Sequence, residues 1–200
     1  MAGALKRLYS LYAPFYDGVV RMHGARRTAV ETLELAAGDR VVIPGAGTGA
    51  DLRHLPAGVR AVAGDISPGM LRRLRSRAGE ATAAVEVREM DARSTGLEAG
   101  SFDAAILHLI VAVVPEPRAC LEETVRLVRP GGRISILDKF APDGRPVAAW
   151  RRVLDPLTRR VATSIICRLE DLLPGLPVEV RSREPAAFGG FFERILLERL

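Results

Sequence analysis

Apolar residues recur along this chain with two spacings, one typical of buried strands and one typical of amphipathic helices. Short continuous apolar runs predict strands that are covered on both faces, whereas spacings of three and four residues predict helices. Strands are expected at 41–43, 60–65, 84–92, 102–108, 133–140, 176–183 and 191–200. Helices are expected at 23–36, at 50–55, from Pro68 onward with Ser67 as N-cap, and at 115–128.

The order of these segments predicts the fold class. Strand and helix alternate as far as residue 140, which favours a parallel sheet with helices on both faces. The last two strands are joined only through Gly189 and Gly190, so they must pair antiparallel. We therefore expect one α/β domain over residues 1–200, with a doubly wound sheet of seven strands, mostly parallel with an antiparallel C-terminal strand.

An aromatic stretch lies near the N-terminus. Residues 5–20 contain three tyrosines and a phenylalanine, and Pro14 interrupts their helical spacing. Two interpretations stay open for this stretch. Residues 1–22 are a lid over a pocket, with tyrosine hydroxyls that reach a ligand, or their rings only cover the core.

Composition narrows the class of protein. Hydrophobic residues make up 48% of the chain and the mean hydropathy is +0.12, as expected for a globular α/β protein. No apolar run approaches the ~20 residues of a membrane span, and no secretory signal pattern opens the chain. The 2 cysteines and 3 histidines are scattered, without metal-ligand spacing. These features predict a reduced, cytoplasmic protein without a metal site.

The net charge of +5 and the pI of about 9.8 come from arginine, because Lys6 and Lys139 are the only lysines among 29 basic residues. Such an excess of arginine over lysine more often reflects the codon composition of a gene than nucleic-acid binding. No basic motif with interleaved aromatic residues appears, so no nucleic-acid partner is expected. Residues 145–170 mix apolar residues with arginines, which fits contact with an anionic membrane surface or a helix that covers the sheet and exposes its arginines.

The candidate chemistry begins directly after the first strand. Gly45, Gly47 and Gly49 follow the apolar run 41–43 and precede the expected helix at 50–55. A strand, a glycine turn and a helix bring backbone close to a nucleotide-like ligand, because glycine lacks the Cβ that would hold the ligand away. The stretch Gly45–Ala50 also fits the G-x-G-x-x-A dinucleotide fingerprint.

Polar residues end three of the following strands. Asp65 ends the second strand, where a carboxylate accepts hydrogen bonds from both hydroxyls of a ribose; its alternative role is to cap a turn. Asp91 ends the third strand and His108 the fourth. Because the carboxyl ends of parallel strands meet at one edge, these side chains are expected beside the glycine loop. His108 is the candidate base, or it only packs at its strand end.

In these motifs the chain resembles the class I S-adenosylmethionine (SAM) methyltransferases over essentially its whole length. Residues 45–49 resemble their glycine motif, 64–71 their acidic motif, 90–92 their adenine motif and 129–132 the turn before strand five. The resemblance implies a Rossmann-like fold, SAM as cofactor and methyltransferase activity. Residues 12–17, Tyr-Ala-Pro-Phe-Tyr-Asp, are similar to a motif of quinone-biosynthesis methyltransferases and small bacterial phospholipid N-methyltransferases.

The resemblance also implies a set of site residues. Asp65 would hold the ribose and Asp91 the adenine amino group, with the base packed between Ile66 and Met90. The residues expected to contact SAM are Tyr16, Gly45, Ala46, Gly47, Asp65, Ile66, Met70, Met90, Asp91, Ala92 and His108. The implied acceptor is a small hydrophobic or amphiphilic molecule, a quinone precursor or a phospholipid. The protein would act as a monomer or homodimer, with peripheral membrane contact.

One position departs from the family pattern. The glycine motif is usually preceded, two residues before its first glycine, by an acid, and Ile43 stands there in this chain. Carbonyls near Gly45, or His108, would then have to recognise the methionine ammonium of SAM. Two alternatives therefore accompany the methyltransferase: a SAM-binding protein without catalysis, and an NAD(P)-dependent oxidoreductase of the Rossmann type.

Overall fold

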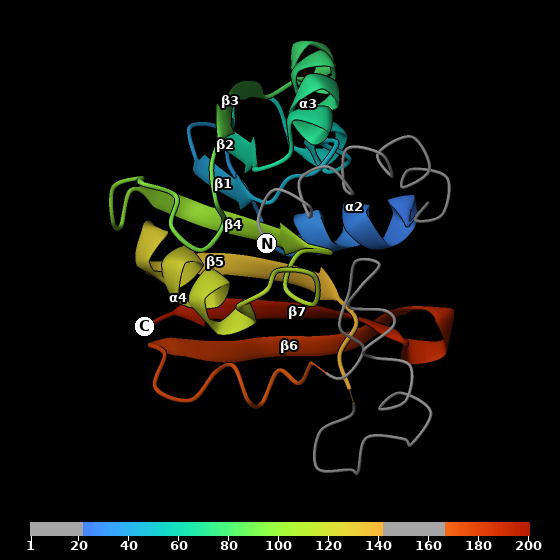
Figure 1. The fold of residues 1–200 in the computed structure, drawn as a ribbon, viewed down its shortest axis with the longest axis vertical. Coiled ribbons are helices and arrows are strands. Elements are labelled where there is room, and N and C mark those ends of the chain that lie inside the picture. The colour runs from blue at the N-terminus through green and yellow to red at the C-terminus, as the bar shows by residue number, and fades with distance from the viewer. Residues whose placement is uncertain (1–21, 142–166) are drawn as a thin grey trace.

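The computed structural model describes residues 22–141 and 167–200, and their strands form one seven-stranded sheet (Figure 1). The strands are β1 (Arg40–Pro44), β2 (Arg60–Asp65), β3 (Ala84–Glu89), β4 (Phe102–His108), β5 (Val128–Asp138), β6 (Val178–Ala187) and β7 (Phe192–Arg199). Their order across the sheet is β3-β2-β1-β4-β5-β7-β6. Strands β1 to β5 pair in parallel, and β7 runs antiparallel to both of its neighbours. This arrangement confirms the fold class expected from the sequence.

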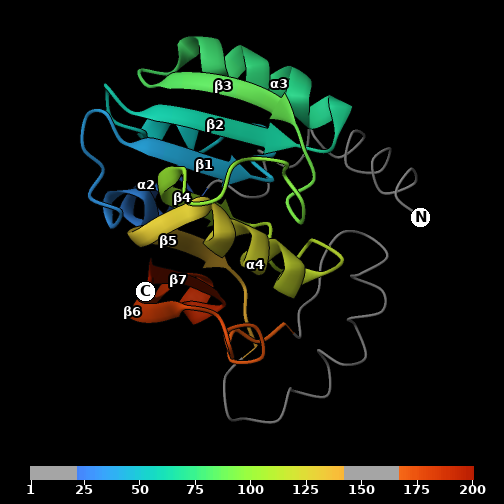
Figure 2. The ribbon, with the colours of Figure 1, turned by 90° about the vertical axis from the view of Figure 1, so that its left-hand side faces the viewer.

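Helices cover both faces of the sheet (Figure 2). The helices in the described residues are α2 (His23–Glu31), α3 (Pro68–Glu80) and α4 (Pro117–Leu127). Consecutive residues of β1 face opposite layers, since Ile43 packs in the cluster that contains Leu74 of α3, and Val42 packs with Leu121 of α4. Both faces of β1 are buried, which explains its continuous apolar run. Among the helices of residues 22–141 and 167–200, none has the length and hydropathy of a membrane span.

The prediction of a helix directly after the glycine loop is wrong. The chain instead passes through turns into a single 3-10 turn, η1 (Leu52–His54). Pro56 disfavours helical backbone at the residue before it, and Leu55 accordingly has an extended ψ of 131°. Leu52 and Leu55 are still buried, so the apolar spacing of this segment reports the packing of a tight turn rather than an α-helix.

The prediction that strands and helices alternate as far as residue 140 is also wrong in part. No helix forms between β3 and β4 in the described chain, where residues 90–101 make turns, irregular backbone and one isolated bridge between Asp91 and Ser94. Helix α2 ends at Glu31 and not at Ala36, and Glu34 adopts a positive φ of 51°. Strand β5 begins at Val128 because the expected turn at 129–132 is an irregularity within the strand, between the pairs Phe102–Val128 and Ala104–Arg133.

The C-terminal hairpin confirms the predicted pair of antiparallel strands. Strand β6 extends to Ala187, and a second 3-10 turn, η2 (Phe188–Gly190), joins it to β7. On its other side β7 pairs with β5, where Glu193 lies beside Asp138 at the end of β5. The tip of the hairpin therefore lies at the edge of the sheet where the parallel strands end (Figure 1).

Candidate functional site

The candidate site lies at the carboxyl edge of the sheet. The chain proceeds from β1 to β2 and β3 in one direction and to β4 and β5 in the other, so the order of the strands switches between β1 and β4. Ligands of open α/β sheets bind beside such a switch, in the crevice outside the carboxyl ends of the strands. The loop Gly45–Gly49 leaves β1 at this point, and Asp65 and His108 end the strands on either side.

The three glycines of the loop have different surroundings, although all have positive φ angles between 58° and 80°. A Cβ on Gly45 would lie 2.6 Å from the Ile110 side chain, and one on Gly49 would lie 2.7 Å from Leu74. A Cβ on Gly47 would meet no atom within 4 Å. Gly45 and Gly49 thus permit close packing inside the protein, whereas Gly47 leaves its backbone open toward the space where a ligand would lie.

Asp65 holds this loop in place. Its carboxylate accepts hydrogen bonds from the backbone N–H of Gly47 at 2.9 Å and of Ser67 at 2.8 Å, one on each oxygen. Burial raises the pKa of Asp65, and these backbone hydrogen bonds oppose the rise. The backbone N–H of Ile66 is a third donor to this carboxylate. A carboxylate has about four acceptor sites, so Asp65 can still accept a hydrogen bond from a ribose. The turn-capping role and the ligand role that the sequence offers for Asp65 are therefore compatible.

Helix α3 fixes the same loop from the other side. Arg77 donates to the Thr48 hydroxyl at 2.7 Å and to the Thr48 carbonyl at 3.2 Å. Sequence analysis missed this contact, because the spacing of α3 indicates only that Arg77 lies near the C-terminal end of the helix. Asp65 and Arg77 together hold the glycine loop through its backbone and through Thr48, so the conformation of Gly47 is fixed by the protein itself.

The expected adenine region is packed around Gly64. A Cβ on Gly64 would lie 2.5 Å from Met90, so this glycine allows the methionine to lie against the β2 backbone. Met70, Met90 and Ala92 are buried, and Ile66 is half-buried. These apolar side chains surround the end of β2 and the turn after β3, where the sequence predicts contact with the base.

Asp91 lies in an ion pair that the sequence did not reveal. Both of its oxygens accept hydrogen bonds from the Arg93 guanidinium, at 3.0 and 2.7 Å, and Arg93 also contacts Glu116 at 2.5 Å. The hydrogen bond from Arg93 to Asp91 is the main cause that raises the pKa of Arg93 above its usual value. An adenine amino group would therefore share Asp91 with Arg93. The role of Asp91 toward adenine stays a prediction.

His108 lies within a buried polar network of four side chains. Its Nδ1 is 2.7 Å from an Asp51 carboxylate oxygen, and its Nε2 is 3.1 Å from the Ser135 hydroxyl. Arg26 donates to the other Asp51 oxygen at 2.5 Å, and Ser135 donates to the Ala29 carbonyl at 2.8 Å. We call Arg26, Asp51, His108 and Ser135 the buried network. It joins α2, the segment after the glycine loop, β4 and β5.

The charges of the buried network compensate one another. Burial by itself would raise the pKa of Asp51, but attraction to Arg26 and His108 and hydrogen bonds from both residues lower it far below its usual range. Asp51 therefore remains an anion between two donors. Both ring nitrogens of His108 have partners inside the protein, and its side chain has no exposed surface. In this arrangement both ring nitrogens are engaged by protein groups, and neither is free to take a proton from a methyl acceptor. The base role of His108 therefore stays a prediction, and its observed contacts are those of a positioning residue.

Sequence analysis missed the other three members of the buried network. Arg26 is a charged residue on the buried side of α2, and this single signal could have indicated an internal carboxylate partner. Nothing in the local sequence marks Asp51 or Ser135. Tyr16 and the lid, apart from Met22, lie outside the described residues, as does nearly all of the basic segment 145–170.

Comparisons with known proteins agree on one family. A methyltransferase domain model matches residues 42–136, which contain the glycine loop and the ends of β2, β3 and β4. A phosphatidylethanolamine N-methyltransferase of Cereibacter sphaeroides is 32% identical over 98% of both chains. A demethylmenaquinone methyltransferase of Clavibacter sepedonicus is 39% identical over 65% of this chain, which spans about half (52%) of that relative.

Solved structures share the fold at low sequence identity. The putative methyltransferase bound to the Trm112 activator of Haloferax volcanii has a TM-score of 0.78 and 16% identity, with 96% of this chain and 97% of that chain covered. A geranyl diphosphate methyltransferase in complex with SAM has a TM-score of 0.71 and 17% identity, with 89% and 85% covered. These likenesses support the fold alone.

Proposed function

The chain belongs to the class I SAM-dependent methyltransferases, and from that premise we propose that it methylates the amine of an aminophospholipid such as phosphatidylethanolamine. The observation that carries the proposal is the match to the phosphatidylethanolamine N-methyltransferase, which spans 98% of both chains. The match to the demethylmenaquinone methyltransferase covers only 52% of that relative, so a shared catalytic core accounts for it. SAM is the cofactor, and the alternatives of an oxidoreductase and of binding without catalysis are set aside.

The proposed SAM site uses the carboxyl edge described above. The open backbone at Gly47, with Gly45 and Ala46 beside it, faces the methionine and ribose portions, and Asp65 accepts a hydrogen bond from the ribose. The adenine lies among Ile66, Met70, Met90 and Ala92, near Asp91. His108 acts from beneath this site, because it holds the segment after the glycine loop through Asp51.

The chemistry requires positioning more than acid–base catalysis. SAM, when bound, supplies a methyl group that its sulfonium has already made electrophilic. The protein has to hold the acceptor nitrogen in line with that methyl group and exclude water. Ile110 lies against the glycine loop at Gly45. Val113 and Val114 follow it in the chain and, like Ile110, are half-buried, so these three side chains would supply an apolar wall for this purpose. A neutral amine is itself the nucleophile, and this is compatible with a His108 ring whose nitrogens are both occupied.

A panel of acceptors tests the proposal. Purified protein would be incubated with SAM labelled in the methyl group and with vesicles of phosphatidylethanolamine, vesicles of phosphatidylglycerol, or a demethylated naphthoquinol. We expect label in the lipid fraction only with phosphatidylethanolamine. Label in the naphthoquinol alone would overturn the phospholipid and favour the quinone precursor, for which the 39% identity to the menaquinone relative is the supporting observation.

A lipid acceptor implies that the protein meets a membrane at its surface. We propose peripheral contact, which the basic segment 145–170 would strengthen through attraction to anionic headgroups. Flotation with anionic and neutral liposomes at two salt concentrations tests this contact. We expect the protein to float with anionic liposomes at low salt. Its absence from that fraction would contradict membrane contact and would leave the acceptor to be decided by the panel.

A further inference from the structure

A lysine lies at the same edge of the sheet, two strands away from the glycine loop. Lys139 directly follows β5, and Phe192 at the start of β7 lies beside it. The Lys139 ammonium is 5.8 Å from the centroid of the Phe192 ring, within the range of a cation–π contact. Strands are spaced about 4.8 Å apart, so Lys139 lies roughly 10 Å across the sheet from the end of β1.

Within residues 22–141 and 167–200, the ammonium of Lys139 makes no ion pair, although Asp138 and Cys167 lie near enough to attract it. Asp138 is buried, and its oxygens accept hydrogen bonds from the backbone N–H groups of Ala112 and Lys139. The arginines of the nearby hairpin differ, since Arg183 pairs with Glu193 at 2.8 Å and Arg194 pairs with Glu184. Burial lowers the pKa of Lys139, and the charge of Asp138 opposes this shift. An external anion would relieve the desolvation of this half-buried cation.

The residue type also distinguishes this position. Arginine supplies nearly every positive charge of the chain, and Lys139 is the only lysine in the described residues. A lysine presents a compact charge with three donors, which suits the tetrahedral oxygens of a phosphate without requiring a planar, bidentate approach.

An apolar surface adjoins the cation. Phe188 at the hairpin tip is 73% exposed, and its ring centroid is 5.8 Å from that of Phe192, which in turn is 5.4 Å from that of Phe191. Phe191 and Phe192 are half-buried, so the exposed apolar surface is that of Phe188. A cation next to such a surface matches a ligand with an anionic group next to an apolar part. Amphipathic surfaces of this kind are favoured where a membrane meets water.

We propose that the Lys139 ammonium binds the phosphodiester of the acceptor, on a floor formed by Phe192 and next to the apolar hairpin tip. This inference rests on the proposed function, because it takes the acceptor to be a phospholipid. The ethanolamine headgroup separates its amine from its phosphate by two carbons. With the amine directed toward the SAM site at β1 and β4, the phosphate is then directed toward β5, where Lys139 lies.

Direct binding of a soluble headgroup tests the proposal without relying on turnover. The probes are glycerophosphoethanolamine, which is the headgroup without acyl chains, and inorganic phosphate. Each would be titrated by calorimetry into the full chain, saturated with the demethylated product of SAM. The variants are Lys139→Met, Lys139→Gln and Lys139→Arg. Arg72→Ala, an exposed charge removed from α3, is the matched control.

We expect Lys139→Met and Lys139→Gln to weaken glycerophosphoethanolamine binding about tenfold or more, as expected for the loss of a charge-assisted contact. Lys139→Arg should retain most of the affinity, and Arg72→Ala should bind like the original protein. Affinity for SAM should stay unchanged in all variants. Tighter binding of inorganic phosphate than of glycerophosphoethanolamine would contradict a diester site. If Lys139→Met does not fold, Lys139→Gln decides the result.

Unchanged binding in Lys139→Met or Lys139→Gln would overturn the proposal, and so would the absence of any binding by the original protein. Activity on phosphatidylethanolamine vesicles separates this failure from failure of the proposed function. An active enzyme whose KM does not respond to Lys139→Gln contradicts the phosphate site alone. If the protein binds the diester through Lys139 but does not methylate phosphatidylethanolamine, the proposed acceptor is contradicted and the phosphate site is retained.

Discussion

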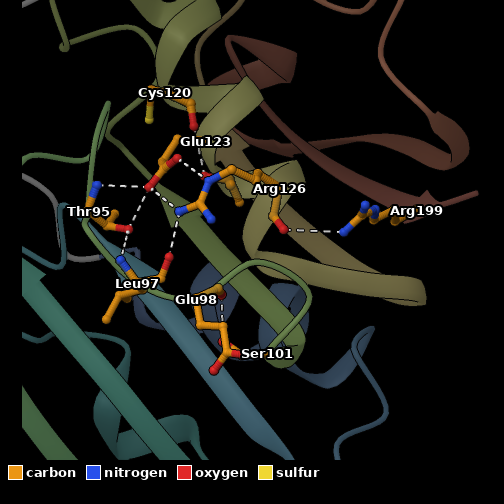
Figure 3. Close-up of polar contacts among 9 residues, drawn as sticks. Thr95, Leu97, Glu98, Ser101, Cys120, Glu123, Arg126 and Arg199 are labelled. Atoms are coloured by element: carbon orange, nitrogen blue, oxygen red, sulfur yellow. Dashed lines mark hydrogen bonds and ion pairs between the residues drawn. The ribbon is translucent and has the colours of Figure 1, made fainter.

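Two clusters of arginine and carboxylate groups fix loops at opposite edges of the sheet, and they differ in burial. The buried network at the carboxyl edge has side-chain exposures of 6% for Arg26, 4% for Asp51 and 0% for His108. At the amino edge, Glu123 of α4 accepts hydrogen bonds from the backbone and hydroxyl of Thr95 and from Arg126, whose side chain is 41% exposed (Figure 3).

The second cluster, which we call the α4 cluster, consists of Thr95, Glu123 and Arg126 with the Leu97 carbonyl. It ties α4 to the chain before β4, and Arg199 of β7 donates to the Arg126 carbonyl (Figure 3). Water can solvate its arginine if the carboxylate is lost. The buried network has no such compensation, so the same pair of residue types is expected to have very different energetic weight at the two edges.

The largest expected effect is the loss of the Asp51 carboxylate. Asp51→Ala leaves Arg26 buried without its charge partner and removes the hydrogen bond to His108, so we expect the free energy of unfolding to fall by about 3–5 kcal/mol. Urea denaturation measures this change. A loss below about 1 kcal/mol would mean that the buried network carries no more weight than a surface pair.

The next effect concerns SAM affinity and compares two aspartates with similar backbone contacts. Asp65 accepts the Gly47 N–H at the carboxyl edge, and Asp103 accepts the Arg40 N–H at 2.8 Å at the amino edge. Asp65→Ala should weaken SAM binding roughly ten- to a hundredfold, whereas Asp103→Ala should leave it unchanged. Calorimetry on both folded variants tests the comparison, and equal losses would show that the effect is general destabilisation.

A smaller effect is expected in the α4 cluster. Glu123→Gln retains a side-chain oxygen for Thr95 but removes the charge that pairs with Arg126, so we expect a loss of about 1 kcal/mol in the free energy of unfolding. SAM affinity should not change. Thermal unfolding and calorimetry measure the two quantities. A clear loss of SAM affinity would show that the amino edge influences the site.

The last prediction concerns the dependence of stability on pH, which tests the same contact of Glu123. Hydrogen bonding from Arg126, above all, lowers the pKa of Glu123 from 4.5 to about 2. A depressed folded-state pKa gives stability that is fully present above pH 4.5 and is lost as the pH falls toward 2. Glu123→Gln should therefore flatten the decline of stability across this window. Urea denaturation at several pH values measures this decline. If the free energy of unfolding falls equally with pH in both proteins, the stabilising contact of Glu123 is not ionic.

The sequence predicted most of the fold because the relevant signals are local. The buried runs of β2 and β4 give their bounds at 60–65 and 102–108, and the short Gly189-Gly190 link gives the antiparallel hairpin. Pro68 after Ser67 marks the start of α3. The failures are local conflicts. Apolar spacing after the glycine loop predicts a helix, but Pro56 and the packing of Leu52 and Leu55 favour a single 3-10 turn.

The sequence by itself determined the glycine loop, the acid at the end of β2 and the edge at which they meet, because strand ends and glycine positions follow from residues close together in the chain. Only the tertiary structure decided that Gly47 alone of the three glycines faces open space, that Arg93 holds Asp91, and that His108 is enclosed. The contacts of the buried network join residues 57 positions apart for His108 and Asp51, and 106 apart for Ser135 and Ala29. Such pairings depend on how the strands are ordered and which face each side chain takes, and no local pattern encodes that choice.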